Sequence, residues 1–111
     1  MSLRKNIRHI LEGSPVTLSS DFLSTLAKKL VEKYPKPEHL SSMANMGSAI
    51  LFSTEAGVVD VRNWLNKTKF QLLSARKYLL KMPEHNIEVT AEIENQTYGM
   101  WAVQLTGVRI Q

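Results

Sequence analysis

The sequence predicts an α+β fold, with a mainly helical N-terminal part and a winged helix-turn-helix-like C-terminal half that ends in a β-hairpin. Three observations support this. Apolar residues recur at helical spacing through most of residues 3–52. Two further one-sided segments within residues 58–82 are separated by a short polar link, and apolar and polar residues alternate strictly from Ile87 onward. Helix, turn, helix and hairpin is the element order of a winged helix-turn-helix.

Length and composition indicate one ordinary globular domain. The chain has 111 residues, 43% hydrophobic and 22% charged, which suits a single domain over residues 1–111. We divide it into a helical portion (1–57) and a helix-turn-helix plus hairpin (58–111). The absence of cysteine excludes disulfides and thiolate metal sites. No apolar run approaches the roughly 20 residues of a membrane span, and we expect no secretory signal, so a cytoplasmic location without a membrane partner is predicted.

The N-terminal portion has the spacing of three helices. The first would span about residues 3–11 and would pack on the domain or on a second copy, because it is too short to be stable alone. The second runs from about Ser20 to Tyr34, and Pro35 ends it. The third runs from about Glu38 to Phe52, and its methionines and small residues suit close helix packing or adaptable binding.

The predicted helix-turn-helix begins at Val58. A first helix of about two turns would end near Asn66, and Thr68 can cap the second helix, Lys69 to about Met82. In that second helix, Leu72 and Leu79 would face the first helix, and the small Ala75 would allow close approach.

One residue fits this register badly. Arg76 projects near the middle of the apolar arc of the second helix, and a buried unpaired arginine would rule the register out. Arg76 could pass that surface with its charged end in solvent, or pair with Asp60. Alternatively the helix is rotated, so that Leu73 and Leu80 face a partner subunit.

Positive charge concentrates on the predicted helix-turn-helix. Residues 58–82 carry six lysines and arginines against one aspartate, whereas residues 83–111 carry one arginine against four glutamates. Double-stranded DNA could be held there through phosphate contacts; a solvated basic face is the alternative. The candidate base readers are Lys69, Gln71, Ser74 and Lys77, and the candidate phosphate contacts are Arg62, Lys67 and Lys81.

The C-terminal hairpin carries the opposite charge. Its first strand alternates between an apolar set (Ile87, Val89, Ala91, Ile93) and a polar set (Glu88, Thr90, Glu92, Glu94). A turn at residues 95–99 leads to a return strand from Trp101 that continues to Ile110. The glutamates would be repelled by DNA, so the hairpin packs away from DNA, or meets a basic partner, or the domain does not bind DNA.

Residues 58–105 resemble the winged-helix domain of the CaiF/GrlA-type transcriptional regulators. The matching features are Asp60, Val61 and Leu65 in a first helix, an Ala-centred second helix, and a short link to a strand with Ile87 and Val89. The resemblance implies a DNA-binding regulator without an enzymatic role. The chain differs from that pattern in having two or three predicted helices ahead of the motif.

No sequence pattern predicts an enzyme. His9, His39 and His85 are far apart and lack metal-ligand spacing. Neither a nucleophile elbow, a phosphate-binding loop nor a dinucleotide fingerprint is present. We therefore expect no catalytic residue, no cofactor and no metal.

Two functions remain open at this point. The first is a small DNA-binding protein, a bacterial or phage transcriptional regulator acting as a homodimer. The alternative is a non-enzymatic protein-interaction module, a phage- or plasmid-encoded factor that binds host machinery. Its interface would be the Met-rich helix, the acidic hairpin face, or the stripe of Leu73 and Leu80.

Overall fold

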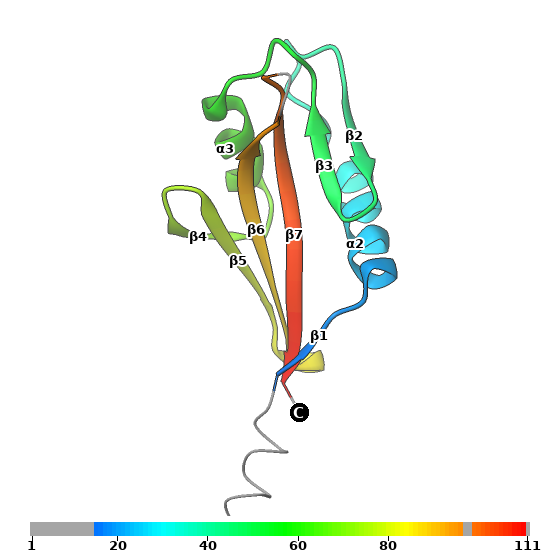
Figure 1. The fold of residues 1–111 in the computed structure, drawn as a ribbon. Helices are drawn as coiled ribbons and strands as arrows, with labels where there is room; N and C mark the ends of the chain where they lie inside the picture. The colour runs from blue at the N-terminus through cyan, green and yellow to red at the C-terminus, as the bar shows by residue number, and fades with distance from the viewer. Residues whose placement is uncertain (1–14, 97–98, 111) are drawn as a thin grey trace, which may run out of the picture.

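The computed structural model describes residues 15–96 and 99–110, in which an antiparallel sheet of seven strands forms one layer (Figure 1). The strand order is β2-β3-β7-β6-β5-β4, and β1 pairs with β7. The strands are β1 (Pro15–Thr17), β2 (Met43–Met46), β3 (Ala49–Phe52), β4 (Gln71–Ser74), β5 (Lys77–Met82), β6 (Ile87–Asn95) and β7 (Trp101–Ile110). The helices are α2 (Ser20–Lys33) and α3 (Val58–Lys67), with a 3-10 turn η1 (Pro83–His85).

The long hairpin of β6 and β7 is the centre of the sheet, and its prediction is confirmed. The two strands pair in register from Ile87 opposite Arg109 to Asn95 opposite Trp101. The four apolar residues predicted to face the core, from Ile87 to Ile93, are buried, and the alternating polar residues are half-buried on the other face. Period-two alternation therefore identified both the strand and its buried face.

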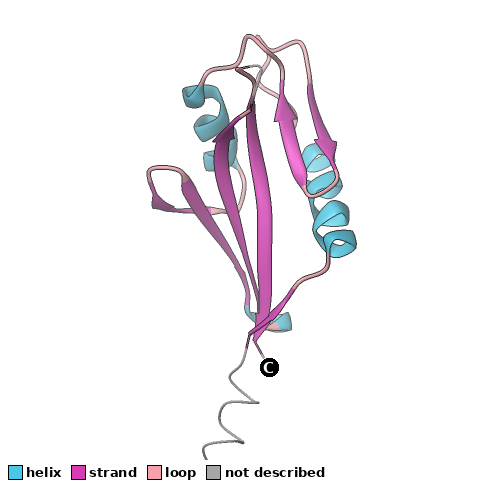
Figure 2. Cartoon of the chain, viewed as in Figure 1, coloured by secondary structure: helices cyan, strands magenta, loops and turns pink. Residues whose placement is uncertain are grey.

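Both helices pack on the same face of the sheet (Figure 2). Leu23, Ala27 and Leu30 of α2 and Val61, Trp64 and Leu65 of α3 join the apolar residues of β3, β6 and β7 in one core. The indole N–H of Trp64 donates to the carbonyl of Tyr34 at 2.8 Å. The Trp64 ring also meets Phe52 edge to face, with centroids 5.7 Å apart. The opposite face, which carries the glutamates of β6, is not covered by a helix within the described residues.

The helices expected at about residues 20–34 and 58–66 are present as α2 and α3. The Ser19 hydroxyl caps α2 by accepting from the Phe22 N–H at 3.1 Å. The helix expected at residues 3–11 lies outside the described residues.

The predicted fold class is wrong in two places. Residues 38–52 contain the hairpin β2–β3 instead of a Met-rich helix, and its turn uses Gly47 at a φ of +57°. Residues 69–82 contain the hairpin β4–β5 instead of a recognition helix. The protein is therefore mostly antiparallel sheet, and a winged helix-turn-helix is excluded.

The physical reason for the second error lies in β5. Tyr78 pairs with Ala91 and is 1% exposed, and Leu80 and Met82 follow it on the same face. Lys77, Leu79 and Lys81 take the other face, opposite the polar residues of β6. The segment therefore alternates with the period of a strand. Its leucines fit the period of a helix equally well, and it is pairing with β6 that makes the segment a strand.

Arg76 also shows that the helical register was wrong. Its side chain is exposed at the β4–β5 turn, with the guanidinium carbon 5.6 Å from the centroid of the Trp101 ring. Leu72 and Leu73, assigned to a helix core or a partner stripe, are 60% and 59% exposed on β4. Leu80 lies apart from them, half-buried on β5, so Leu73 and Leu80 do not form one stripe.

Candidate binding groove

The two helices do not cover the whole helix-bearing face, and a groove lies between α2 and β5. It consists of two hollows of about 180 Å³ and 360 Å³, which adjoin because Leu26, Lys29 and Met82 line both. The hollows follow α2 from Phe22 to Tyr34, a span of about 18 Å at the helical rise per residue.

The floor of the groove is apolar. Residues of α2 spaced four apart supply one side, and alternate residues of β5 supply the other. The floor residues are Phe22, Leu26, Leu30, Phe70, Leu80, Met82 and Ile87. Leu30, Phe70 and Ile87 are buried, whereas the other four are only partly buried and leave apolar surface open to a ligand.

The rim of the groove is cationic. Exposed side chains with a permanent positive charge stand along both sides: Lys29, Lys33, Lys69 and Arg109, with His85 near Arg109. No carboxylate lines either hollow, and within the described ranges the ion pairs found involve none of these cations. Lys33 Nζ lies 5.6 Å from the centroid of the Tyr34 ring. The groove therefore presents four cationic side chains around an apolar floor.

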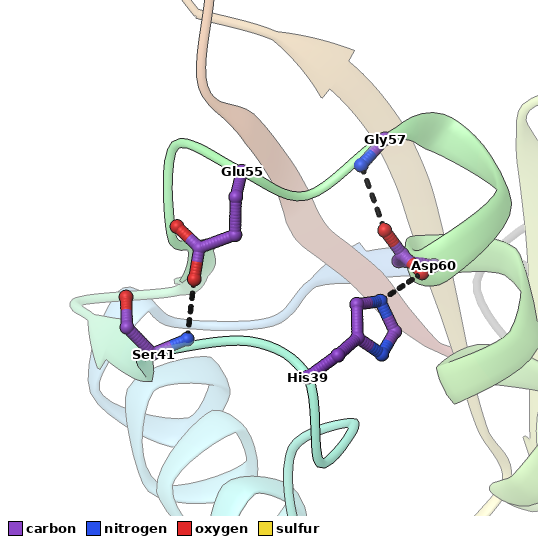
Figure 3. Close-up of polar contacts among 5 residues, drawn as sticks. All are labelled: His39, Ser41, Glu55, Gly57 and Asp60. Atoms are coloured by element: carbon purple, nitrogen blue, oxygen red, sulfur yellow. Dashed lines mark hydrogen bonds and ion pairs between the residues drawn. The ribbon is translucent and has the colours of Figure 1, made fainter.

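A separate polar cluster joins the segment after α2 to the start of α3 (Figure 3). His39 Nε2 lies 2.7 Å from Asp60 Oδ1, and Asp60 Oδ2 accepts from the Gly57 N–H at 2.9 Å. That backbone N–H, together with His39, lowers the pKa of Asp60. Glu55 accepts from the Ser41 N–H, and this bond holds the pKa of Glu55 at about 2.

This polar cluster has a structural role. Its bonds connect residues 39–41 to residues 55–60, and one of them satisfies the Gly57 N–H at the N-cap of α3. Across the described part of the chain, no three histidine, aspartate or glutamate side chains gather closely enough to hold a metal ion. We therefore take the groove, and not this cluster, as the candidate functional site.

The structure separates the seven residues predicted to contact DNA. They lie on α3 (Arg62, Lys67), before β4 (Lys69), on β4 (Gln71, Ser74) and on β5 (Lys77, Lys81). Lys77 and Lys81 pair across the strands with Glu92 and Glu88 on the face away from the helices, and Lys77 Nζ is 3.6 Å from Glu92 Oε2. Only Lys69 lines the groove. A recognition helix carrying four base readers is excluded, because residues 69–82 are not helical.

Sequence reasoning missed the other groove residues. Lys29 and Lys33 fall within the helix that was expected at about residues 20–34, but they were taken as part of its polar face, largely opposite the apolar one. Their spacing four apart beside Leu26 and Leu30 was a signal that could have identified a cationic edge. The opposite side of the groove could not be found, because Leu80 and Met82 face α2 only when β5 is a strand.

Comparisons with protein-family models, curated protein sequences and solved structures found no match to this chain. Within the described residues, neither α2 nor α3 is long and apolar enough to cross a membrane.

Proposed function

We propose that this protein is a non-enzymatic protein-interaction module that docks an acidic, partly apolar segment of another protein in the groove between α2 and β5. The observation that carries the proposal is an open apolar floor surrounded by Lys29, Lys33, Lys69 and Arg109, with no carboxylate in the lining. An apolar floor contributes binding free energy through burial, and a cationic rim selects anionic partners and speeds their association.

Binding is proposed instead of catalysis because of the chemistry of the lining. Its only aliphatic hydroxyl, on Thr25, donates to the Asp21 carbonyl of its own helix at 3.0 Å, so its proton is directed at the backbone and not at a catalytic base. The cations stand at the rim, where they can attract an anion, and the floor that they surround carries no reactive group.

Charge also favours a foreign segment over a part of this chain. The sequence of residues 1–14 contains Arg4, Lys5 and Arg8 against Glu12, so its net charge has the same sign as the rim. A second copy of the protein, with a net charge of +4, is likewise repelled overall. An acidic segment of another protein relieves the repulsion among the rim cations.

Duplex DNA is the competing anionic partner. Its phosphates could contact the rim lysines, but a phosphate backbone would leave the apolar floor uncovered. Groove binding by an acidic protein segment uses both the floor and the rim, which is why it is proposed first.

The test is fluorescence anisotropy with a labelled peptide rich in leucine and glutamate. Lys29→Glu should weaken binding about 5- to 10-fold, because reversing a rim charge replaces an exposed attraction by a repulsion of similar size. Lys28→Glu is the matched control, since Lys28 is exposed on the same helix but lines neither hollow, and it should change binding less than about 2-fold.

Equal losses in the two variants would show that net charge alone, and not the groove, controls peptide binding. Tighter binding of duplex DNA than of the peptide, weakened by Lys77→Glu and Lys81→Glu but not by Lys29→Glu, would favour a nucleic-acid partner on the opposite face.

A further inference from the structure

We infer that the docked segment binds as an amphipathic α-helix of about 12 residues, lying beside α2 as a third helix of the helical layer. This inference rests on the proposed function and adds the conformation and placement of the partner.

The sheet beneath the groove is wide enough for one more helix. At the level of Leu80 the order of strands is β5, β6 and β7, with Leu80 opposite Val89 and Val89 opposite Gly107. Two spacings between these three strands amount to about 10 Å, which is the width of one helix with its side chains.

The position of the uncovered strip agrees with this width. α2 contacts β2, β3 and β7, and α3 contacts β7. The C-terminal part of α3 lies over the start of β5, where the Tyr78 hydroxyl donates to Asn66 Oδ1 at 3.3 Å. Leu80 and Met82, which follow Tyr78 on β5, face the groove and are only partly buried. The open strip therefore begins where α3 ends and runs beside α2.

The backbone of the ligand needs hydrogen-bond partners on the floor of the groove. β5 pairs with β6 along its whole length, and with β4 from Lys77 to Leu79. A peptide that added to the remaining edge of β5, from Leu80 to Met82, would lie in the plane of the sheet and leave the floor uncovered. An extended peptide lying on the floor itself would place its own N–H and C=O groups on apolar side chains without sheet partners. A helix satisfies those groups internally and presents only side chains to the floor.

Cations stand on both sides of the groove. Lys29 and Lys33 stand on the α2 side one helical turn apart, Lys69 precedes β4, and Arg109 lies at the other end near His85. Both flanks of an inserted helix would therefore face positive charge. The matching ligand has an apolar stripe at i, i+3, i+4 and i+7, with glutamates or aspartates on either side of the stripe.

The experiment compares three labelled peptides, each about 14 residues long. The first has leucines at helical spacing, and the second has the same composition but alternates leucine and glutamate. The third is the first peptide with one central glutamate replaced by proline. Anisotropy with the full chain should show that the helical-spacing peptide binds at least about 10-fold tighter than the other two. Proline removes a hydrogen bond of the helix. In the alternating peptide the leucines do not share one face of a helix. The helical circular dichroism of the helical-spacing peptide should increase on binding.

Two protein variants test the location. Leu26→Ala should weaken the helical-spacing peptide about 10-fold, since Leu26 lines both hollows. Leu79→Ala, a half-buried leucine on the opposite face, should leave its affinity within about 2-fold. If Leu26→Ala fails to fold, Lys29→Glu replaces it.

The outcomes separate this inference from the proposed function. If all three peptides bind equally and Lys29→Glu weakens them all, the groove function stands and the helical ligand is wrong. If the alternating peptide binds tightest, the ligand is extended and the inference is wrong. If none of the peptides binds, both the inference and the proposed function fail.

Discussion

Replacing Tyr78 and Leu72 by alanine, one at a time, distinguishes the hairpin β4–β5 from a helix over the same residues. Tyr78 is 1% exposed in the core, and Leu72 is 60% exposed on the edge strand. Removing a large buried aromatic side chain typically costs about 3–5 kcal/mol in the free energy of unfolding, from lost burial and the cavity left behind. Removing a largely exposed side chain away from the core changes it by about 0.5 kcal/mol or less. The expected difference between the two variants in the free energy of unfolding is therefore at least about 2.5 kcal/mol.

Urea unfolding followed by far-ultraviolet circular dichroism measures both free energies. A loss of about 3–5 kcal/mol is a large share of the stability of a small domain, so Tyr78→Leu, which keeps part of the apolar volume, should fall between wild type and Tyr78→Ala. A helix over residues 69–82, with Leu72 toward its neighbour and Tyr78 toward solvent, requires the reverse order. Equal losses, or a larger loss for Leu72→Ala, would refute the strand assignment and the groove built on it.

Three further substitutions test the packing and the polar cluster. Trp64→Phe should lower the free energy of unfolding by about 2 kcal/mol in urea titrations, because it leaves the Tyr34 carbonyl without its donor; an unchanged value would contradict that bond. Gly107→Ala should cost about 1–3 kcal/mol, because a Cβ there would lie 2.6 Å from Leu18 Cδ1, and wild-type stability would show that Leu18 moves aside freely. The pKa of Glu55 falls from its ordinary value of 4.5 to about 2, so its stabilising contribution is present above pH 4.5 and is lost as the pH falls toward 2. Glu55→Gln should therefore flatten the decrease in melting temperature over this acidic range, and an undiminished decrease would contradict the bond.

Local sequence signals were sufficient to predict α2, β6 and α3, because the pattern of each fits only one kind of element. α2 combines a serine cap, an apolar face and a proline after its end, and all three act within a few residues of the helix. The strand β6 alternates over eight residues without interruption, from Ile87 to Glu94, and no helical face can be drawn through it. α3 is similarly one-sided, with Val61, Trp64 and Leu65 buried.

The two hairpins that were predicted as helices depend on contacts distant in sequence. Leu72, Leu73, Leu79 and Leu80 form an apolar arc in a helix and also supply both faces of a hairpin. The choice is made by β6, because Tyr78 and Leu80 pair with Ala91 and Val89. For β2–β3, Gly47 at the turn was the local sign of a hairpin, but a small residue within an apolar run also suits a packed helix.

For the candidate site, too, local sequence signals were sufficient for one part and not for the other. The helix that carries Lys29 and Lys33 could be predicted from the sequence, but their position at the edge of a groove could not, because it depends on what packs beside the helix. The floor could not be placed, since it requires β5 to lie beside α2 in space. The net positive charge of residues 58–82 was real, but the fold distributes it over α3, the groove rim and the opposite sheet face.

The most direct test of the account is amide chemical-shift mapping by NMR, with the full chain titrated with the helical-spacing leucine–glutamate peptide. If the peptide docks in the groove, the largest shifts fall along it, at residues such as Leu26, Lys29, Phe70 and Met82. Saturable shifts centred instead on the glutamate-bearing face of β6, or an unchanged spectrum, would contradict the groove as the binding site.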